Sequence, residues 1–365
     1  MIRARINTPP TSYDALIENG LLRSAGVYLR DVLPNTRRIF TITVPRVRRH
    51  YGKILAAAMK DAGLENRFLE MPDGERWKNL KTVEQLALKM VKYGADRESA
   101  VVALGGGVVG DVTGFLGSIY MRGIKMVQAP TTFLAQVDAS IGGKTGVNLA
   151  SGKNLVGTFK QPRLVLIDPT VLMTLPEREF RAGLFEALKT GVIRNARIFE
   201  FMEENRERIL ARDAVSLEWL ISESVRVKAS VVSEDELEKN VRMVLNFGHT
   251  VGHALETETR YRHFLHGEAV AWGMIAAASI AVKMGKTDEA TAQRVIDLVR
   301  SYGPLPSVKV NPRNIIKRLT RDKKTIHGKV HFILPSALGQ VEVHSDVPER
   351  VLIHAIEELK LLSHA

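Results

Sequence analysis

The sequence contains no cysteine among its 365 residues. A disulfide is therefore excluded, and any metal would be bound through nitrogen and oxygen ligands. No apolar run is long enough to cross a bilayer, and the most apolar stretch, residues 269–282, is short and rich in alanine, which indicates a buried helix. The first residues, MIRAR, lack the apolar core of a signal peptide. We therefore expect a cytoplasmic protein that does not bind a membrane.

Aromatic residues are also scarce, at 6%, whereas positive charge is in excess, with a formal net charge of +12. A nucleic-acid-binding protein would gather basic residues on one face, ideally with aromatics. The basic residues here are spread out, and their densest runs lie at 46–49 and 321–324. The alternative is an enzyme whose pocket collects cations for an anionic substrate. We favour the enzyme and expect no nucleic-acid partner.

The first half of the chain alternates short apolar segments with amphipathic ones, which predicts a parallel sheet covered by helices. Residues 141–157, rich in Gly, Lys and Asn, predict a loop or hairpin. The expected strands are 38–44, 67–71, 100–104, 125–129 and 164–167, and the expected helices are 47–62 and 80–93.

Helical patterns dominate after Pro169, and one short β-like segment, 329–334, comes late. We expect two domains, an α/β domain at 1–175 and a mainly helical domain at 176–365. Because ligands of open α/β sheets sit beyond the carboxyl ends of the strands, a helical domain docked there would close a cleft. The expected helices are 177–193, 198–209, 217–232, 243–258, 267–284 and 289–302.

Three of the ten histidines lie in one short region. His249 and His253 are four residues apart, so on a helix they share one face, and His266 follows nearby. Neutral imidazoles suit a divalent metal such as zinc. A zinc protease would need Glu after the first His, and Thr250 stands there instead. The residues predict a metal site but leave open which histidines bind the metal.

Two glycine-rich segments favour anion binding. The first, LGGGVVGD at 104–111, follows a buried strand and precedes a helix, where glycines and helix N–H groups could receive a phosphate; a tight structural turn is the alternative. The second, GGKTG at 142–146, resembles the end of a Walker A loop, but Asp138 stands where that motif requires its first Gly. Lys144, Lys153 and Asn154 of this region suit a phosphate or carboxylate, unless the loop is simply solvated.

Several charged residues lie among apolar neighbours. Glu186 and Lys189 are three apart on one expected helix, where they form either an ion pair or, with Glu186 completing a His₂Glu set, part of a metal site. Arg242 and Asn246 precede His249 by seven and three residues, so one continuous helix would bring all three near one face. Together with Lys228 they would suit a polyhydroxy acid.

Taken together, the motifs resemble those of the 3-dehydroquinate synthase family, the sugar phosphate cyclases of the shikimate pathway, which leads to chorismate and the aromatic amino acids. The resemblance runs from about residue 73 to 338. It rests on residues 105–111, 120–123, 129–132, 137–138, 142–145, 152–155, 186–189, 246–249 and 265–268, which occur in the order of the family.

The resemblance implies a Rossmann-like NAD-binding α/β domain, a helical metal-binding domain, and an active site in the cleft between them. It also implies a homodimer that converts the sugar phosphate 3-deoxy-D-arabino-heptulosonate 7-phosphate to 3-dehydroquinate and phosphate. Zinc or cobalt is implied to be bound by Glu186, His249 and His266, with His253 facing the substrate. The implied NAD contacts are Asp73, Glu75, Lys78, Gly106, Gly107, Val108, Asp111, Thr131, Thr132, Lys144, Lys153 and Thr174.

The implied substrate side is rich in cations, which would offset phosphate and carboxylate charge. Glu238 is a candidate for an acid–base or positioning role, as is His253. Two features depart from the family: Thr43-Val44-Pro45 replaces the usual polar residue near the adenosine, and no small glycine precedes Arg242. The implied substrate contacts are Arg122, Asp138, Lys144, Asn154, Lys189, Lys228, Arg242, Asn246, His253 and one of Lys323 and Lys324, of which we favour Lys324.

Two related activities compete with this interpretation. A sibling cyclase acting on another sugar phosphate would share the cofactors, but a neutral sugar would leave Arg242 without an anionic partner. A metal-dependent NAD polyol dehydrogenase would not need the lysine-rich anion site.

Overall fold

The structure, a computed structural model, describes residues 1–319 and 330–364. It divides into two compact units, the first formed by Met1–Pro176 with Leu217–Leu237 and the second by Glu177–Ser216 with Glu238–Ala365. The segment Leu217–Leu237 follows the expected domain boundary in sequence but packs with the first unit.

A seven-stranded sheet forms the centre of the first unit, with strand order β1-β2-β9-β6-β5-β3-β4. All neighbouring strands are parallel except β1 and β2, which are antiparallel. The predicted parallel sheet is thus confirmed for the five strands that the sequence indicated. The strands are β1 Ile2–Ile6, β2 Tyr13–Ile17, β3 Ile39–Thr43, β4 Asn66–Glu70, β5 Ala100–Gly105, β6 Lys125–Pro130 and β9 Leu164–Ile167.

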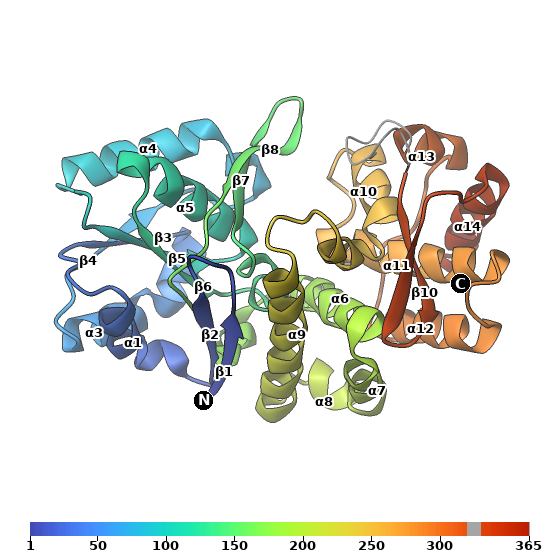
Figure 1. The fold of residues 1–365 in the computed structure, drawn as a ribbon, viewed down its shortest axis with the longest axis horizontal. Helices are drawn as coiled ribbons and strands as arrows, with labels where there is room; N and C mark the ends of the chain where they lie inside the picture. Colours follow the sequence, from blue (N-terminus) through green and yellow to red (C-terminus); the bar gives the residue numbers. More distant parts are fainter. Residues whose placement is uncertain (320–329, 365) are drawn as a thin grey trace. The chain divides into compact units, whose positions relative to one another are not determined.

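Helices cover both faces of this sheet (Figure 1). Side chains alternate along β5: Val101 and Ala103 pack in one apolar cluster, and Val102 and Leu104 pack in another. This strict alternation with no exposed face explains why the strand reads as an unbroken apolar run. The first cluster contains side chains from the helices α4 Leu80–Lys92 and α5 Gly107–Ile119. The second contains side chains from α1 Ala25–Val32 and α3 Lys53–Asp61.

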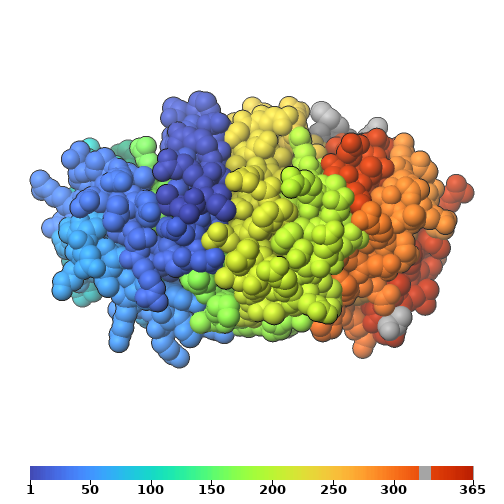
Figure 2. Space-filling view, turned by 90° about the horizontal axis from the view of Figure 1, so that it is seen from below, coloured from blue at the N-terminus to red at the C-terminus, as the bar shows by residue number. Residues whose placement is uncertain are grey.

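The N-terminal hairpin of β1 and β2 was not among the predicted strands. The long helix α9, Ala214–Glu234, lies beside it, as the dark blue and yellow surfaces in Figure 2 show. The backbone N–H of Asn7 donates to Ser233 Oγ at 2.8 Å, and Asn19 Nδ2 donates to Glu218 Oε2 at 2.8 Å. These bonds help to hold α9 to the first unit.

Residues 141–157 contain the expected hairpin, formed by β7 Lys144–Leu149 and β8 Gly152–Phe159. The helix predicted at 47–62 is divided into α2 Pro45–Val47, a π-helical turn η2 Arg48–Gly52, and α3. The predicted segment is therefore helical, but the π turn shifts its register midway.

The described residues of the second unit are mainly helical, as predicted, and they also form a two-stranded sheet of β10 Phe332–Ala337 and β11 Gln340–His344. Its longest apolar helix, α11 His266–Lys283, is buried from Gly267 to Ala281, which confirms the buried helix expected there. The remaining helices are α6 Glu177–Arg194, α7 Ala196–Glu204, α8 Arg206–Leu210, α10 His249–Glu258, α12 Glu289–Ser301, α13 Pro312–Leu319 and α14 Glu349–Leu362.

The single helix predicted at 243–258 is wrong. The structure has a 3₁₀ helix, η7 Val241–Asn246, followed by a break and then α10. Gly248 produces the break with a φ of 77°, in the left-handed region that favours glycine. Arg242 and Asn246 are therefore not on the helix that carries His249. Within the described residues, no helix has the length and apolar character needed to span a membrane.

Candidate functional site

Four potential metal-binding side chains converge from three helices of the second unit. Glu186 comes from the middle of α6, His249 and His253 lie one turn apart on α10, and His266 is the first residue of α11. The ligand atoms of the three histidines all lie within 4.8 Å of one another. Glu186 Oε1 lies 3.8 Å from Nε2 of His249 and 3.8 Å from Nε2 of His266. The predicted cluster is therefore assembled in space.

Two of the imidazoles are oriented from behind. Nδ1 of His249 lies 3.1 Å from the carbonyl oxygen of Phe247, and Nδ1 of His266 lies 3.2 Å from Glu256 Oε2. A carbonyl or carboxylate oxygen can only accept, so each Nδ1 must carry the proton. When these rings are neutral, the Nε2 lone pair of each lies on the side of Glu186. This arrangement of an outer acceptor behind a ligating histidine is usual at metal sites.

The carboxylate of Glu186 is almost completely enclosed, with an exposed fraction of 1%. Lys189 forms an ion pair with its Oε2, and no described residue donates a hydrogen bond to its Oε1. Oε1 faces Nε2 of two histidines, where a divalent cation would complete the contacts of this buried carboxylate. Both the carboxylate and the neighbouring imidazoles therefore fit a divalent metal of the zinc or cobalt type.

The charges around His266 also favour a cation at this site. Burial lowers the pKa of its imidazole, but the hydrogen bond and charge of Glu256, with the charge of Glu186, outweigh burial and hold that pKa above its ordinary value. The site thus attracts positive charge. The ligand set Glu186, His249 and His266 remains a prediction, because His253 lies equally within the cluster.

Glycines allow the three helices to approach one another at backbone distance. A Cβ atom on Gly267 would lie 1.8 Å from the carbonyl oxygen of Ala182, one turn before Glu186 on α6. A Cβ atom on Gly273 would lie 1.8 Å from the carbonyl oxygen of Gly248. Side chains at these crossings would separate α6, α10 and α11, and with them the four potential metal-binding side chains.

The predicted phosphate-binding turn lies at the carboxyl end of β5 in the first unit. Gly106 is the N-cap of α5, and the N–H of Thr131 donates to the carbonyl oxygen of Gly105 at 2.9 Å. A Cβ atom on Gly106 would lie 2.9 Å from Thr132 Cγ2. The predicted cofactor residues Gly106, Gly107, Val108, Thr131 and Thr132 thus surround the start of one helix, whose N–H groups suit an anion.

Lys78 links further predicted residues of the first unit. Its buried ammonium donates to Asp111 and, at 2.6 Å, to Asn154 Oδ1. Asn148 was not predicted but connects the same group: its Nδ2 donates to Glu75 Oε1 at 2.8 Å, and its Oδ1 accepts from the N–H of Asn154 at 2.9 Å. Its place at the end of β7, in the polar stretch before Asn154, was the available signal.

A second cation of the first unit is equally enclosed. Lys228 of α9 has an exposed fraction of 5% and forms an ion pair with Asp138 of the π-helical turn η5, Ala135–Ala139. It also donates to the carbonyl oxygen of Asp138 at 2.7 Å. Two predicted substrate residues, far apart in the sequence, are therefore in contact.

Backbone strain marks other predicted positions. Arg122, Asn154 and Glu238 have φ angles of 69°, 54° and 58°, which non-glycine residues seldom adopt outside constrained sites. Glu238 Oε1 also accepts from Asn246 Nδ2 at 3.4 Å, in the second unit. Thr174 Oγ1 lies 2.5 Å from the hydroxyl of Tyr51, a partner that sequence reasoning missed.

The remaining predicted residues fall as follows. Arg242 is buried in η7 with an exposed fraction of 1%. Asp73 precedes the short helix η3, Glu75–Trp77, while Lys144 begins β7 and Lys153 lies on β8. Lys323 and Lys324 lie outside the described residues. The second unit thus holds Lys189, Arg242, Asn246 and His253, and the first holds Arg122, Asp138, Lys144, Asn154 and Lys228.

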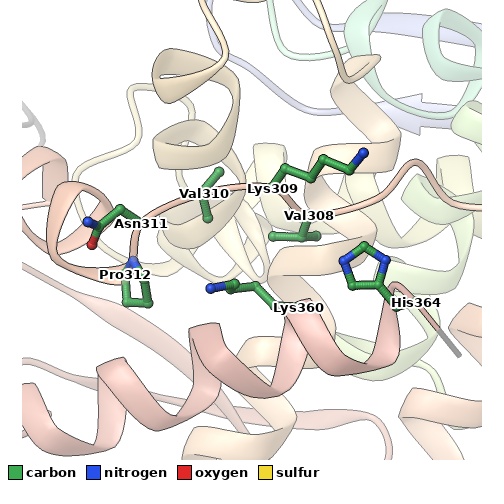
Figure 3. A pocket seen from close by; sticks show the side chains of 7 residues that line it. All are labelled: Val308, Lys309, Val310, Asn311, Pro312, Lys360 and His364. Atoms are coloured by element: carbon green, nitrogen blue, oxygen red, sulfur yellow. The ribbon is translucent and has the colours of Figure 1, made fainter.

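An open cavity of about 510 Å³ lies elsewhere in the second unit. Segment 308–312 and the end of α14 line it, and none of its lining residues is a predicted site residue. Figure 3 shows the ammonium groups of Lys309 and Lys360 pointing away from each other. The cavity therefore lacks the convergent polar groups expected of a catalytic pocket.

The fold is that of the sugar phosphate cyclases. The chain is 30% identical to 2-epi-5-epi-valiolone synthase from Streptomyces hygroscopicus subsp. jinggangensis 5008, solved with NAD⁺ and Zn²⁺, with a TM-score of 0.89 and coverage of 97% of this chain and 98% of that one. It is 31% identical to 2-deoxy-scyllo-inosose synthase, solved with carbaglucose-6-phosphate, NAD⁺ and Co²⁺, with a TM-score of 0.87 and coverage of 98% and 100%. An iron-containing alcohol dehydrogenase from Thermococcus thioreducens, at 14% identity and a TM-score of 0.68, shares the fold alone.

Sequence comparison is more specific. The family models described as 3-dehydroquinate synthase N-terminal and C-terminal match residues 68–182 and 183–325. The chain is 59% identical to the 3-dehydroquinate synthase of Koribacter versatilis, covering 100% of this chain and 99% of that protein. It is 49% identical to that of Solibacter usitatus, covering 96% and 97%. The chain belongs to the 3-dehydroquinate synthase family.

Proposed function

We propose that the chain converts 3-deoxy-D-arabino-heptulosonate 7-phosphate to 3-dehydroquinate and phosphate, using NAD and a divalent metal. Full-length identity of 59% to a 3-dehydroquinate synthase supports the activity. The single structural observation that carries the metal part is the enclosed Glu186 carboxylate facing Nε2 of two histidines. The overall change is an elimination of phosphate followed by ring opening and aldol closure.

We assign Glu186, His249 and His266 as metal ligands and His253 as a substrate contact. The bound metal would hold and acidify the substrate's vicinal hydroxyls, and NAD would accept a hydride and return it. His253, one turn beyond His249, would lie beside the hydroxyls and could hydrogen-bond to them. Lys189, buried against Glu186, would add positive charge near the same oxygens.

The cofactor and anion roles rest on the groups described in the first unit. The helix start at Gly106–Val108 and Thr131–Thr132 would receive the pyrophosphate, and Asp111 and Lys78 would position the nicotinamide side. Lys144, Asn154 and Arg122 would hold the substrate phosphate, and Lys228 would join them from its pair with Asp138. We also propose a homodimer in the cytoplasm, as the family resemblance implies.

Phosphate release tests the proposal. Purified protein loaded with NAD and Zn²⁺ should release inorganic phosphate from the heptulosonate phosphate over repeated turnovers, and removal of the metal with a chelator should stop it. No release from fully loaded protein would reject the proposed activity.

A sibling cyclase activity is the competing function. The two solved relatives at 30–31% identity are named 2-epi-5-epi-valiolone synthase and 2-deoxy-scyllo-inosose synthase. Glucose 6-phosphate, which has no carboxylate, serves as the discriminating probe. Arg242 is buried in η7, where a carboxylate would match its charge. Turnover of glucose 6-phosphate in preference to the heptulosonate would favour the sibling activity.

A further inference from the structure

Glu256 lies at the end of α10, three residues after His253 and seven after His249. Its exposed fraction is 3%, so its carboxylate is held inside the protein. One oxygen, Oε2, lies 3.2 Å from Nδ1 of His266, which belongs to the next helix, α11. A buried carboxylate in contact with an imidazole strongly restricts both the rotation and the tautomer of that ring.

We propose that Glu256 is the positioning residue of the metal site. By accepting the Nδ1 proton of His266, it places the Nε2 lone pair toward Glu186, whose Oε1 is 3.8 Å away. His249 needs no such side chain, because the carbonyl oxygen of Phe247 performs the same task at 3.1 Å. This inference rests on the proposed metal-dependent function and adds a residue to it.

Helix α10 therefore orients two imidazole rings. It carries His249 itself, and its Glu256 holds His266 at the start of α11. His266 needs this support because its side chain is 32% exposed, compared with 11% for His249, so packing restrains it less. The negative charge of Glu256 also makes the imidazole a stronger electron donor to a metal.

The variants Glu256→Gln and Glu256→Ala separate the two contributions of the carboxylate. The glutamine amide oxygen can still accept from Nδ1 but has no charge, whereas alanine removes both the acceptor and the charge. We expect zinc affinity to fall by roughly 10-fold for Glu256→Gln and roughly 100-fold for Glu256→Ala, the range found when outer partners of metal-binding histidines are removed.

Glu258 provides the matched control on the same helix. Its carboxylate pairs with Arg318 and accepts from Asn314 Nδ2 at 2.8 Å, and among the described residues it makes no hydrogen bond or ion pair with a histidine. Glu258→Gln therefore removes the charge of a similarly placed acid without touching His266. Its zinc affinity should equal that of the wild-type protein.

Zinc affinity would be measured by competition with a chromogenic chelator, and the visible absorption of the Co²⁺-substituted proteins would report the ligand field at saturation. The Co²⁺ bands should shift in both Glu256 variants and not in Glu258→Gln, an effect that loss of fold stability alone would not produce. Thermal unfolding of the metal-free proteins would verify that each variant folds; Glu256→Gln keeps the test valid if the alanine variant does not fold.

The outcomes are distinct. Weakened zinc binding with shifted Co²⁺ bands in the Glu256 variants alone supports the inference. Wild-type zinc affinity and Co²⁺ spectra in both Glu256 variants, or in Glu256→Gln if the alanine variant does not fold, would overturn it while leaving the proposed function intact. A wild-type protein that binds neither Zn²⁺ nor Co²⁺ would overturn the proposed metal site and this inference with it.

Discussion

A methyl group at Gly267 should push apart the helices that carry Glu186 and His266. Gly267 directly follows His266, and a Cβ atom at this position would lie 1.8 Å from the carbonyl oxygen of Ala182. Nonbonded heavy atoms need about 3.5 Å, so Gly267→Ala requires a local displacement of roughly 1.7 Å. Because Ala182 precedes Glu186 by one helical turn, that displacement falls directly on the carboxylate that we propose binds the metal.

The size of the effect follows from two opposing contributions. Overpacking a rigid core costs about 3 kcal/mol at the upper end of its usual range, which a backbone clash warrants. Alanine recovers about 1 kcal/mol of helix propensity relative to glycine. The net loss of about 2 kcal/mol corresponds to a decrease in Tm of about 4–8 °C for a unit of this size. Zinc affinity should fall about 10-fold or more, because ligands must stay within about 0.5 Å of their positions.

Differential scanning calorimetry and chelator competition would measure these two quantities. Gly117→Ala in α5 is the matched control, because its Cβ atom would meet only the side-chain methyl of Val101, at 3.1 Å, and the Cβ of Met126, at 3.7 Å, in the other unit. That variant should change stability by less than about 1 kcal/mol and leave zinc affinity unchanged. If Gly267→Ala has the Tm and the zinc affinity of the wild-type protein, the close approach of the helices does not support the metal site.

Three further predictions concern single side chains. His266→Ala should lose bound zinc while His253→Ala retains it, as metal analysis of the purified proteins would show; equal loss in both would mean that the ligand set is wrong. Arg242→Met should lower kcat/KM for the heptulosonate phosphate by about 30-fold or more, since truncating a buried charged partner costs about 2–5 kcal/mol, and an unchanged value would disprove its role with the carboxylate. Lys78→Met should destabilise the first unit by about 3 kcal/mol, the lower end for a broken buried pair because Asp111 is partly exposed; a denaturant titration giving wild-type stability would contradict this.

Local sequence patterns were sufficient for the central elements of the fold. β5 and β9 are apolar on both faces, and their runs of Val, Leu, Ile and Ala are readable without knowledge of their neighbours. The N-terminal hairpin was not predicted because β1 and β2 are held by contacts with β9 and α9, which are distant in the sequence. The break at Gly248 was missed because apolar periodicity continues across it, although the backbone turns sharply.

The residues of the candidate site were likewise predictable only where local spacing or a motif indicates them. His249 and His253 could be paired from their helical spacing, with His266 and Glu186 as further candidates, and the motif resemblance then selected Glu186, His249 and His266 as the ligands. The roles of Glu256 and Asn148 depend on contacts between separate elements, which spacing along one chain does not specify. One signal was available, since His249, His253 and Glu256 occupy positions i, i+4 and i+7 of one helix face.

The assignment of Leu217–Leu237 to the first unit has a consequence for how the chain is synthesised. The polypeptide passes between the units three times, near residues 176, 216 and 237. During translation, the strands of the first unit emerge long before α9, so this unit stays incomplete until residue 237 has left the ribosome. A fragment cut at residue 176 would contain every strand of the sheet and yet lack Lys228, the cation paired with Asp138.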